Sequence, residues 1–140
     1  MVSETFVRAG NCSEVEMMKE LAANGPIAVG IEPGAGFEDY RSGIYIEPPE
    51  DRLARLSGKA AAGAFEPTGH AVLIVGYGTE NGTKYWRVKN SWGRHFGETG
   101  YFRCRRGTDE MAIESMAMSA DIVLPKQATA TSTNTTSPSQ

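Results

Sequence analysis

Residues 69–90 read GHAVLIVGYGTENGTKYWRVKN, and this stretch decides the fold. Ala71 to Tyr77 is apolar apart from one glycine and the tyrosine hydroxyl, which predicts a central strand. The Asn81-Gly82 pair favours a tight hairpin turn with positive φ. In residues 84–90, Tyr85, Arg87 and Lys89 alternate with Trp86, Val88 and Asn90. This two-residue period predicts a strand that returns beside the first.

The segment before this hairpin predicts one helix and several short elements. Ser13 to Glu16 reads as a capping box, with the serine as N-cap and the glutamate three residues later. Apolar residues follow at helical spacing until Asn24-Gly25-Pro26, which predicts the end of the helix. Short strands are predicted at 27–31 and 43–46, with one helical turn at 37–40.

The segment after the hairpin predicts more strands. A strand is expected at 101–105, a turn at 112–116 and a last strand at 117–124. Several antiparallel strands with one N-terminal helix indicate an α+β fold that forms a barrel-type subdomain. Between the two halves, residues 47–68 show no periodicity. A loop of this length is typically functional, mobile or cleaved, although it can also be a surface insertion without a role.

Length and charge limit the class of protein. The chain has 140 residues, of which 1–125 form one predicted domain, while the Ser/Thr-rich tail at 126–140 has the composition of a disordered segment. The net charge of −3 is spread along the chain and predicts no binding to nucleic acid or to an anionic membrane. No apolar run approaches the ~20 residues of a membrane-spanning helix. Residues 1–11 lack the layout of a signal peptide.

The cysteines predict no metal centre. Cys12 and Cys104 are the only two, and a structural zinc site needs about four ligands at close spacing. From the sequence they can pair with each other, stay free or pair outside the chain. Glycosylation patterns begin at Asn11, Asn81 and Asn134 and weakly favour a secretory route.

The candidates for acid–base chemistry near neutral pH are His70 and His95. His70 opens the first strand of the predicted hairpin and Asn90 closes the second, so the hairpin brings both to the same end. An amide oxygen that accepts from one ring N–H sets the imidazole tautomer and aims the other nitrogen. The alternative is a structural histidine at a strand end.

Three stretches carry a resemblance to a known family. Residues 69–78 resemble the catalytic-histidine strand of papain-like cysteine peptidases, residues 85–93 their asparagine motif, and residues 97–102 the segment that follows. The order and spacing agree, and the resemblance extends from Gly10 to Leu124. It implies a papain-like fold, of which this chain is the C-terminal barrel half.

The resemblance also implies roles for individual residues. His70 is expected to be the general base and acid partner of a cysteine thiolate, and Asn90 to orient its imidazole. Trp92 is expected to cover this pair and shield its hydrogen bond from water, although it can also be a core residue. His95 is expected to be a solvated loop residue. Phe96 replaces the family's usual second tryptophan, which affects packing near the leaving-group side.

Residues 103–116 are most similar to the branch of the family known as dipeptidyl peptidase I. By that resemblance Met116 lies at the floor of the S2 pocket and favours medium-sized apolar side chains, with a core role as the alternative. No cofactor is implied apart from a chloride ion, which the resemblance allows near this pocket. Cys12 is expected to pair with a cysteine upstream of the chain, and the loop 47–68 to be proteolytically processed.

The same branch implies a core position for Cys104. The alternative is an exposed thiol whose pKa is lowered by neighbouring arginines. Two departures stand out: Gly69 replaces the asparagine usual in this branch, and Met111 and Cys104 exchange the usual cysteine and apolar positions.

The family's nucleophilic cysteine and oxyanion-hole glutamine match nothing in the chain, so we expect it to be inactive alone. Its expected partners are the upstream, cysteine-bearing part of the peptidase and peptide substrates, and the whole enzyme can be an oligomer. The expected activity is release of N-terminal dipeptides in a lysosome or another secretory or endosomal vesicle, or after secretion. Alternatives are a papain-like endopeptidase fragment and a truncated, non-catalytic peptide-binding homologue. An isolated barrel half is expected to be poorly soluble.

Overall fold

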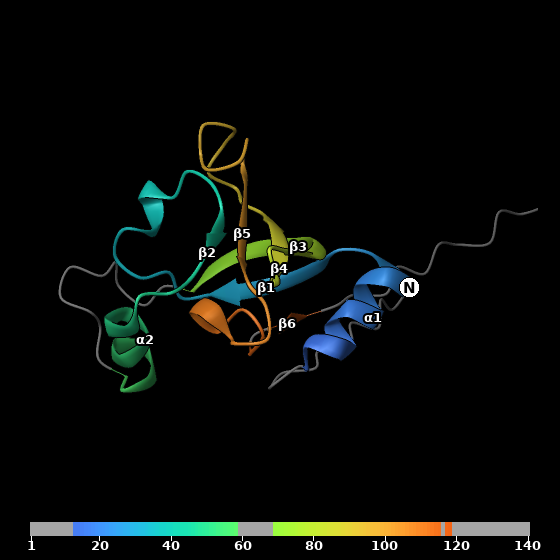
Figure 1. Ribbon diagram of the computed structural model, residues 1–140, viewed down its shortest axis with the longest axis horizontal. Helices are drawn as coiled ribbons and strands as arrows, with labels where there is room; N and C mark the ends of the chain where they lie inside the picture. Colours follow the sequence, from blue (N-terminus) through green and yellow to red (C-terminus); the bar gives the residue numbers. More distant parts are fainter. Residues whose placement is uncertain (1–12, 59–68, 116, 119–140) are drawn as a thin grey trace, which may run out of the picture.

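A computed structural model of the chain describes residues 13–58, 69–115 and 117–118. Its strands are β1 (Ile27–Ile31), β2 (Ile44–Tyr45), β3 (His70–Glu80), β4 (Thr83–Lys89), β5 (Tyr101–Arg105) and β6 (Ala117–Met118). They form one sheet in the order β2-β5-β4-β3-β1-β6 (Figure 1). All neighbours are antiparallel except β2 and β5, which run parallel.

Helix α1 (Glu14–Asn24) begins and ends where the sequence predicts. The backbone N–H of Glu16 donates to Ser13 Oγ at 3.2 Å, which confirms the cap. Gly25 follows the helix at φ 96°, a conformation that glycine adopts without steric cost. Met17 is buried and joins the helix to the hydrophobic core.

The hairpin of β3 and β4 is confirmed. Asn81 and Gly82 lie in the turn with φ of 49° and 80°, the positive values that a two-residue hairpin requires. The register shifts between Ile74 and Gly76, so a bulge bends β3. Beyond the bulge Leu73 pairs with Lys89, and the two strands therefore end close together.

One face of the sheet carries the core. Its alternate side chains are buried, with Ile74 on β3, Trp86 and Val88 on β4, and Phe102 on β5 all 0% exposed. Cys104 on β5 is also 0% exposed, and burial, followed by the charges of Glu110 and Glu114, raises the pKa of its thiol. The prediction of a core cysteine is confirmed, and the alternative of an exposed, low-pKa thiol is wrong.

A second helix, α2 (Pro49–Leu56), lies in the stretch for which the sequence predicted no regular structure. Proline at the first helical position and acidic residues in the first turn favour a helix start here. Arg55 in its last turn makes an ion pair with Glu47 at 2.9 Å, so a contact outside the helix stabilises this short segment of eight residues. Residues 59–68 lie outside the described residues, and processing of this loop stays a prediction.

The α+β class is confirmed, with one difference in the sheet. Among the described residues β2 and β6 are its two edges, so the sheet is open rather than closed into a barrel. Two single-turn helices, η1 (Phe37–Asp39) and η2 (Glu110–Ala112), complete the fold. In the part of the chain that the structure describes, no helix combines the length and apolar character needed to cross a membrane. Cys12, Met116, the end of the predicted last strand and the tail at 126–140 lie outside the described residues.

Candidate active site

The hairpin places His70 and Asn90 side by side at one end of the sheet. His70 opens β3 opposite Ile31, the last residue of β1, and Asn90 directly follows β4. The Nε2 atom of His70 lies 2.8 Å from Oδ1 of Asn90. Asn90 is buried, at 7% exposed, and its own backbone N–H donates to Gly100 O at 2.9 Å. The backbones of both residues are thus held by hydrogen bonds or strand pairing, His70 opposite Ile31 and Asn90 to Gly100.

The neighbours of Asn90 determine which ring nitrogen carries the proton. Its Oδ1 also accepts from the backbone N–H of Ser91 at 2.8 Å, which identifies this atom as the amide oxygen. An amide oxygen only accepts, so Nε2 of His70 donates and the neutral ring has its lone pair on Nδ1. Among the described residues no group forms a hydrogen bond with Nδ1. The arrangement leaves one basic nitrogen available for proton transfer.

Trp92 covers the histidine. The two rings are stacked with centroids 4.9 Å apart and an interplanar angle of 25°. Phe37 and Phe96 pack edge-on against Trp92 at 5.8 and 5.0 Å. The sequence predicted the cover but not Phe37, which comes from a distant single-turn helix. An indole over the pair lowers the local dielectric and strengthens the hydrogen bond between His70 and Asn90.

Glu98 holds the loop that brings Phe37 to Trp92. Its carboxylate accepts from the backbone N–H of Gly43 at 3.0 Å and from the guanidinium of Arg103 at 2.8 Å. Burial alone raises the pKa of Glu98, but the hydrogen bonds from Arg103 and Gly43 outweigh it, and the net pKa is lowered. The sequence placed Glu98 inside a family motif without a role, and the structure supplies one in positioning.

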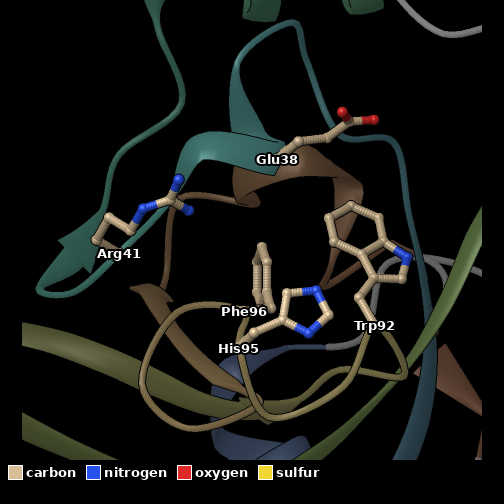
Figure 2. A pocket seen from close by; sticks show the side chains of 5 residues that line it. All are labelled: Glu38, Arg41, Trp92, His95 and Phe96. Carbon is tan, nitrogen blue, oxygen red and sulfur yellow. The ribbon is translucent and has the colours of Figure 1, made fainter.

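A hollow of about 260 Å³ lies beside the covered pair and is lined by Glu38, Arg41, Trp92, His95 and Phe96 (Figure 2). Trp92 therefore borders both the histidine and this hollow. His95 is exposed, as predicted for a loop histidine, but it also contributes to the wall. Phe96 is 3% exposed and forms an aromatic surface between the ionisable groups. The hollow therefore offers both apolar and charged surface next to Trp92.

Of the other cysteine and S2-pocket residues singled out from the sequence, the structure describes only Cys104. Cys12 and Met116 lie outside the described residues, so their predicted roles stay predictions. Cys104 is enclosed in the core between strands. Within 13–58, 69–115 and 117–118, no three His, Cys, Asp or Glu side chains form a group that could hold a metal ion. The site therefore consists of a histidine, an amide and an aromatic cover.

Comparison with known proteins identifies the family. The family model described as papain family cysteine protease matches residues 2–121. The chain belongs to this family. It is 44% identical to Cathepsin C of Schistosoma mansoni over 117 residues, which is 82% of this chain and 25% of that protein. The chain thus spans about a quarter of the length of this relative.

Solved structures confirm the papain-like fold. Digestive procathepsin L2 proteinase from the larval midgut of Tenebrio molitor matches with a TM-score of 0.64 and 35% identity, over 81% of this chain and 32% of that one. The bromelain protease from Ananas comosus, in complex with the E64 inhibitor, matches with a TM-score of 0.64 and 29% identity. That match covers 86% of this chain and 51% of bromelain. The predicted membership of the papain family is confirmed.

Proposed function

We propose that this chain is the histidine- and asparagine-bearing part of a cysteine peptidase that releases N-terminal dipeptides. The observation that carries the proposal is the 2.8 Å hydrogen bond between His70 Nε2 and Asn90 Oδ1 beneath Trp92. It fixes the tautomer and leaves Nδ1 as the base. A peptidase that uses a cysteine nucleophile needs such an oriented imidazole next to the thiol.

The chemistry then runs through Nδ1 of His70. It takes the proton of the cysteine thiol, and the resulting thiolate attacks the carbonyl carbon of the scissile peptide bond. The imidazolium returns that proton to the leaving amine, which departs and leaves an acyl group on sulfur. His70 next takes a proton from water, whose oxygen attacks the acyl carbon. The bond between carbon and sulfur then breaks, the imidazolium returns its proton to the sulfur, and the dipeptide is released. Asn90 keeps the ring in place through all of these proton transfers.

The nucleophile is a cysteine of another part of the protein. Cys104 is enclosed in the core, and burial raises the pKa of its thiol. It therefore does not readily form the thiolate that a nucleophile requires. The chain spans a quarter of Cathepsin C and half of bromelain, so these relatives contain further polypeptide. We infer that the nucleophilic cysteine lies in a part of this protein that corresponds to the further polypeptide of these relatives. We also infer that this chain is inactive alone. Peptides are its substrates, and the hollow beside Trp92 receives residues on the leaving-group side.

Dipeptide release is supported by the 44% identity to Cathepsin C and by the resemblance of residues 103–116 to the dipeptidyl peptidase I branch. Endopeptidase activity is the second candidate, because the fold also matches procathepsin L2, with a TM-score of 0.64. In the first case Met116 forms part of the S2 pocket, with a chloride ion as a further proposed component. A non-catalytic, peptide-binding role is the third candidate.

A lysosomal or other secretory compartment is the proposed location. The support is membership of the cathepsin-containing family and the glycosylation pattern at Asn81. Asn81 lies exposed at the tip of the hairpin, where an enzyme can reach it.

The first experiment measures the mass of the native protein, captured with antiserum to residues 19–24, which are exposed or half-exposed on α1, before and after reduction. Chains recovered alongside are sequenced. A larger assembly with a cysteine-bearing partner supports the proposal, and a lone particle of about the 15.1 kDa expected from sequence contradicts it.

A second experiment separates the candidates by substrate. The native assembly is assayed with a dipeptidyl-coumarin substrate that has a free N-terminus and with its N-acetylated counterpart. A dipeptide-releasing enzyme cleaves the free form at least 100-fold faster, whereas an endopeptidase cleaves the two at similar rates. Absence of cleavage in both, with retained peptide binding, favours the non-catalytic role.

A further inference from the structure

Helix α2 turns two charged residues, Asp51 and Arg55, inward and its leucines outward. Asp51 is 8% exposed and the side chain of Arg55 is 10% exposed. Leu53 and Leu56 are 70% and 68% exposed. A surface helix of a globular protein normally has the opposite arrangement, with its apolar side against the core. The orientation of α2 therefore needs a cause and leaves an apolar surface without a partner in the described residues.

The cause is an ion pair on the buried side of the helix. The guanidinium of Arg55 donates to both carboxylate oxygens of Glu47, at 3.0 and 2.9 Å, and to Asp109 O at 3.0 Å. The side chain of Glu47 is 1% exposed, and it also accepts from the backbone N–H of Met111 at 3.2 Å. Rolling the helix to bury its leucines breaks this pair and leaves a buried charge. The leucines are thus held outward.

The leucines lie at the same end of the molecule as the candidate active site. The first turn of α2 packs so closely on Gly34 that a Cβ at Gly34 would clash with the carboxylate of Asp51. Gly34 follows shortly after Ile31, which pairs with His70. Figure 1 shows α2 beyond the end of the sheet where β1 finishes and β3 begins.

The area of this surface selects the kind of partner. The two leucine side chains, 70% and 68% exposed, offer on the order of 100 Å² each, or about 200 Å² together. A stable interface between separate proteins buries about 800 Å² on each partner. The leucines of α2 are therefore too few to hold a second copy or an unrelated protein. They suffice as one part of a larger contact within a single peptidase domain, and the longer relatives have the additional polypeptide for it.

We propose that Leu53 and Leu56 form a leucine face that docks the cysteine-bearing part of the same peptidase. This inference rests on the proposed function and adds where the two parts meet. Arg55 and Glu47 set the orientation of the face, and the face in turn ties the missing part to the end of the sheet that carries His70. Alignment of the cysteine with Nδ1 then depends on α2 as well as on the active-site hairpin.

The test is site-specific photo-crosslinking in the whole polypeptide that contains this chain, produced in its own cells. A diazirine analogue of leucine replaces Leu53 in one sample and Val15, which is 52% exposed on α1, in a second. Crosslinked peptides are identified by mass spectrometry. We expect the probe at 53 to label a peptide of the cysteine-bearing part, and the probe at 15 not to do so. Labelling of a second copy of α2, of another protein, or of nothing overturns the proposal.

The double substitution Leu53→Glu/Leu56→Glu provides a second measurement. We expect at least a 10-fold lower yield of assembled enzyme, with α2 still helical by hydrogen exchange, while Val15→Glu leaves the yield unchanged. Wild-type yield in the double variant overturns the docking but not the proposed function. The expected crosslink in a protein without peptidase activity contradicts the proposed function but not the docking.

Discussion

Two buried polar clusters lie near the same end of the sheet, and they differ in how completely their groups are paired. In the cluster below α2, both carboxylate oxygens of Glu47 and of Glu110 accept hydrogen bonds. In the pair of His70 and Asn90, the ring nitrogen Nδ1 and the buried amide nitrogen Nδ2 have no partner among the described residues.

The difference teaches which cluster can carry chemistry. A fully paired network of charges has a structural role, since protonating one of its carboxylates leaves a buried guanidinium without its counter-charge. A histidine with one nitrogen occupied and the other available is oriented and still reactive. Trp92 holds the His70 ring by stacking and therefore leaves Nδ1 free. A charged neighbour would instead form a hydrogen bond with Nδ1.

The largest expected effect is on activity. In the assembled peptidase His70→Ala is expected to lower kcat/KM by at least about 10³-fold, or about 4 kcal/mol, because it removes the base. The free energy of unfolding should change little, since this side chain is only half buried. The matched control is His95→Ala, which should change kcat/KM by less than about 3-fold. An equal loss in both variants would assign the chemistry to the hollow instead.

The next effect is on stability. Arg55→Met leaves Glu47 as a buried, unpaired charge, and we expect it to lower the free energy of unfolding by about 3 kcal/mol. Urea unfolding followed by tryptophan fluorescence measures this change. The double variant Glu47→Gln/Arg55→Met removes the charge and should recover part of the loss. A single variant as stable as wild type would show that the network below α2 is not needed.

A smaller effect depends on pH. Hydrogen bonds from Arg103 and Gly43 lower the pKa of Glu98 in the folded state despite its burial. A lowered folded pKa means that the carboxylate stabilises the fold above its ordinary pKa of about 4.3, and that this contribution is lost as the pH falls through the folded pKa. Glu98→Gln should cost about 1–2 kcal/mol at pH 7.

Unfolding measured at a series of pH values tests this assignment. The difference in unfolding free energy between wild type and Glu98→Gln should shrink as the pH falls below about 4. A difference that stays constant down to pH 3 would mean that the charge of Glu98 is not involved. Glu38→Gln provides the control, because that exposed glutamate forms no ion pair within the described part of the chain.

The smallest effect concerns Tyr45, whose hydroxyl lies near the charged cluster below α2 but is not paired as the groups of that cluster are. The hydroxyl of Tyr45 is buried without a partner among the described residues, and burial, followed by the charge of Asp51, raises its pKa. Because the hydroxyl lacks a hydrogen bond, Tyr45→Phe should be neutral or stabilise the fold by up to about 1 kcal/mol. Urea unfolding at pH 7 measures it. A loss above about 1 kcal/mol would show that the hydroxyl is bonded in solution, for example by a water molecule.

Local chemistry explains what could be predicted about the fold. The strands at 27–31 and 101–105, the cap at Ser13 and the turn at Asn81-Gly82 depend on neighbours within a few residues, and the structure confirms them. Helix α2 was missed because its stabilising contacts, from Arg55 to Glu47 and Asp109, join residues whose proximity only folding creates.

The sequence by itself determined the family, the hairpin and the meeting of His70 with Asn90, because a two-residue turn sets which ends of two strands coincide. Only the tertiary structure decided which ring nitrogen remains free, since that depends on the backbone N–H of Ser91 and on the amide orientation. It also decided that Phe37 supports Trp92 and that α2 faces its leucines outward. These features arise from packing and charge pairing between distant segments, and no local pattern records them.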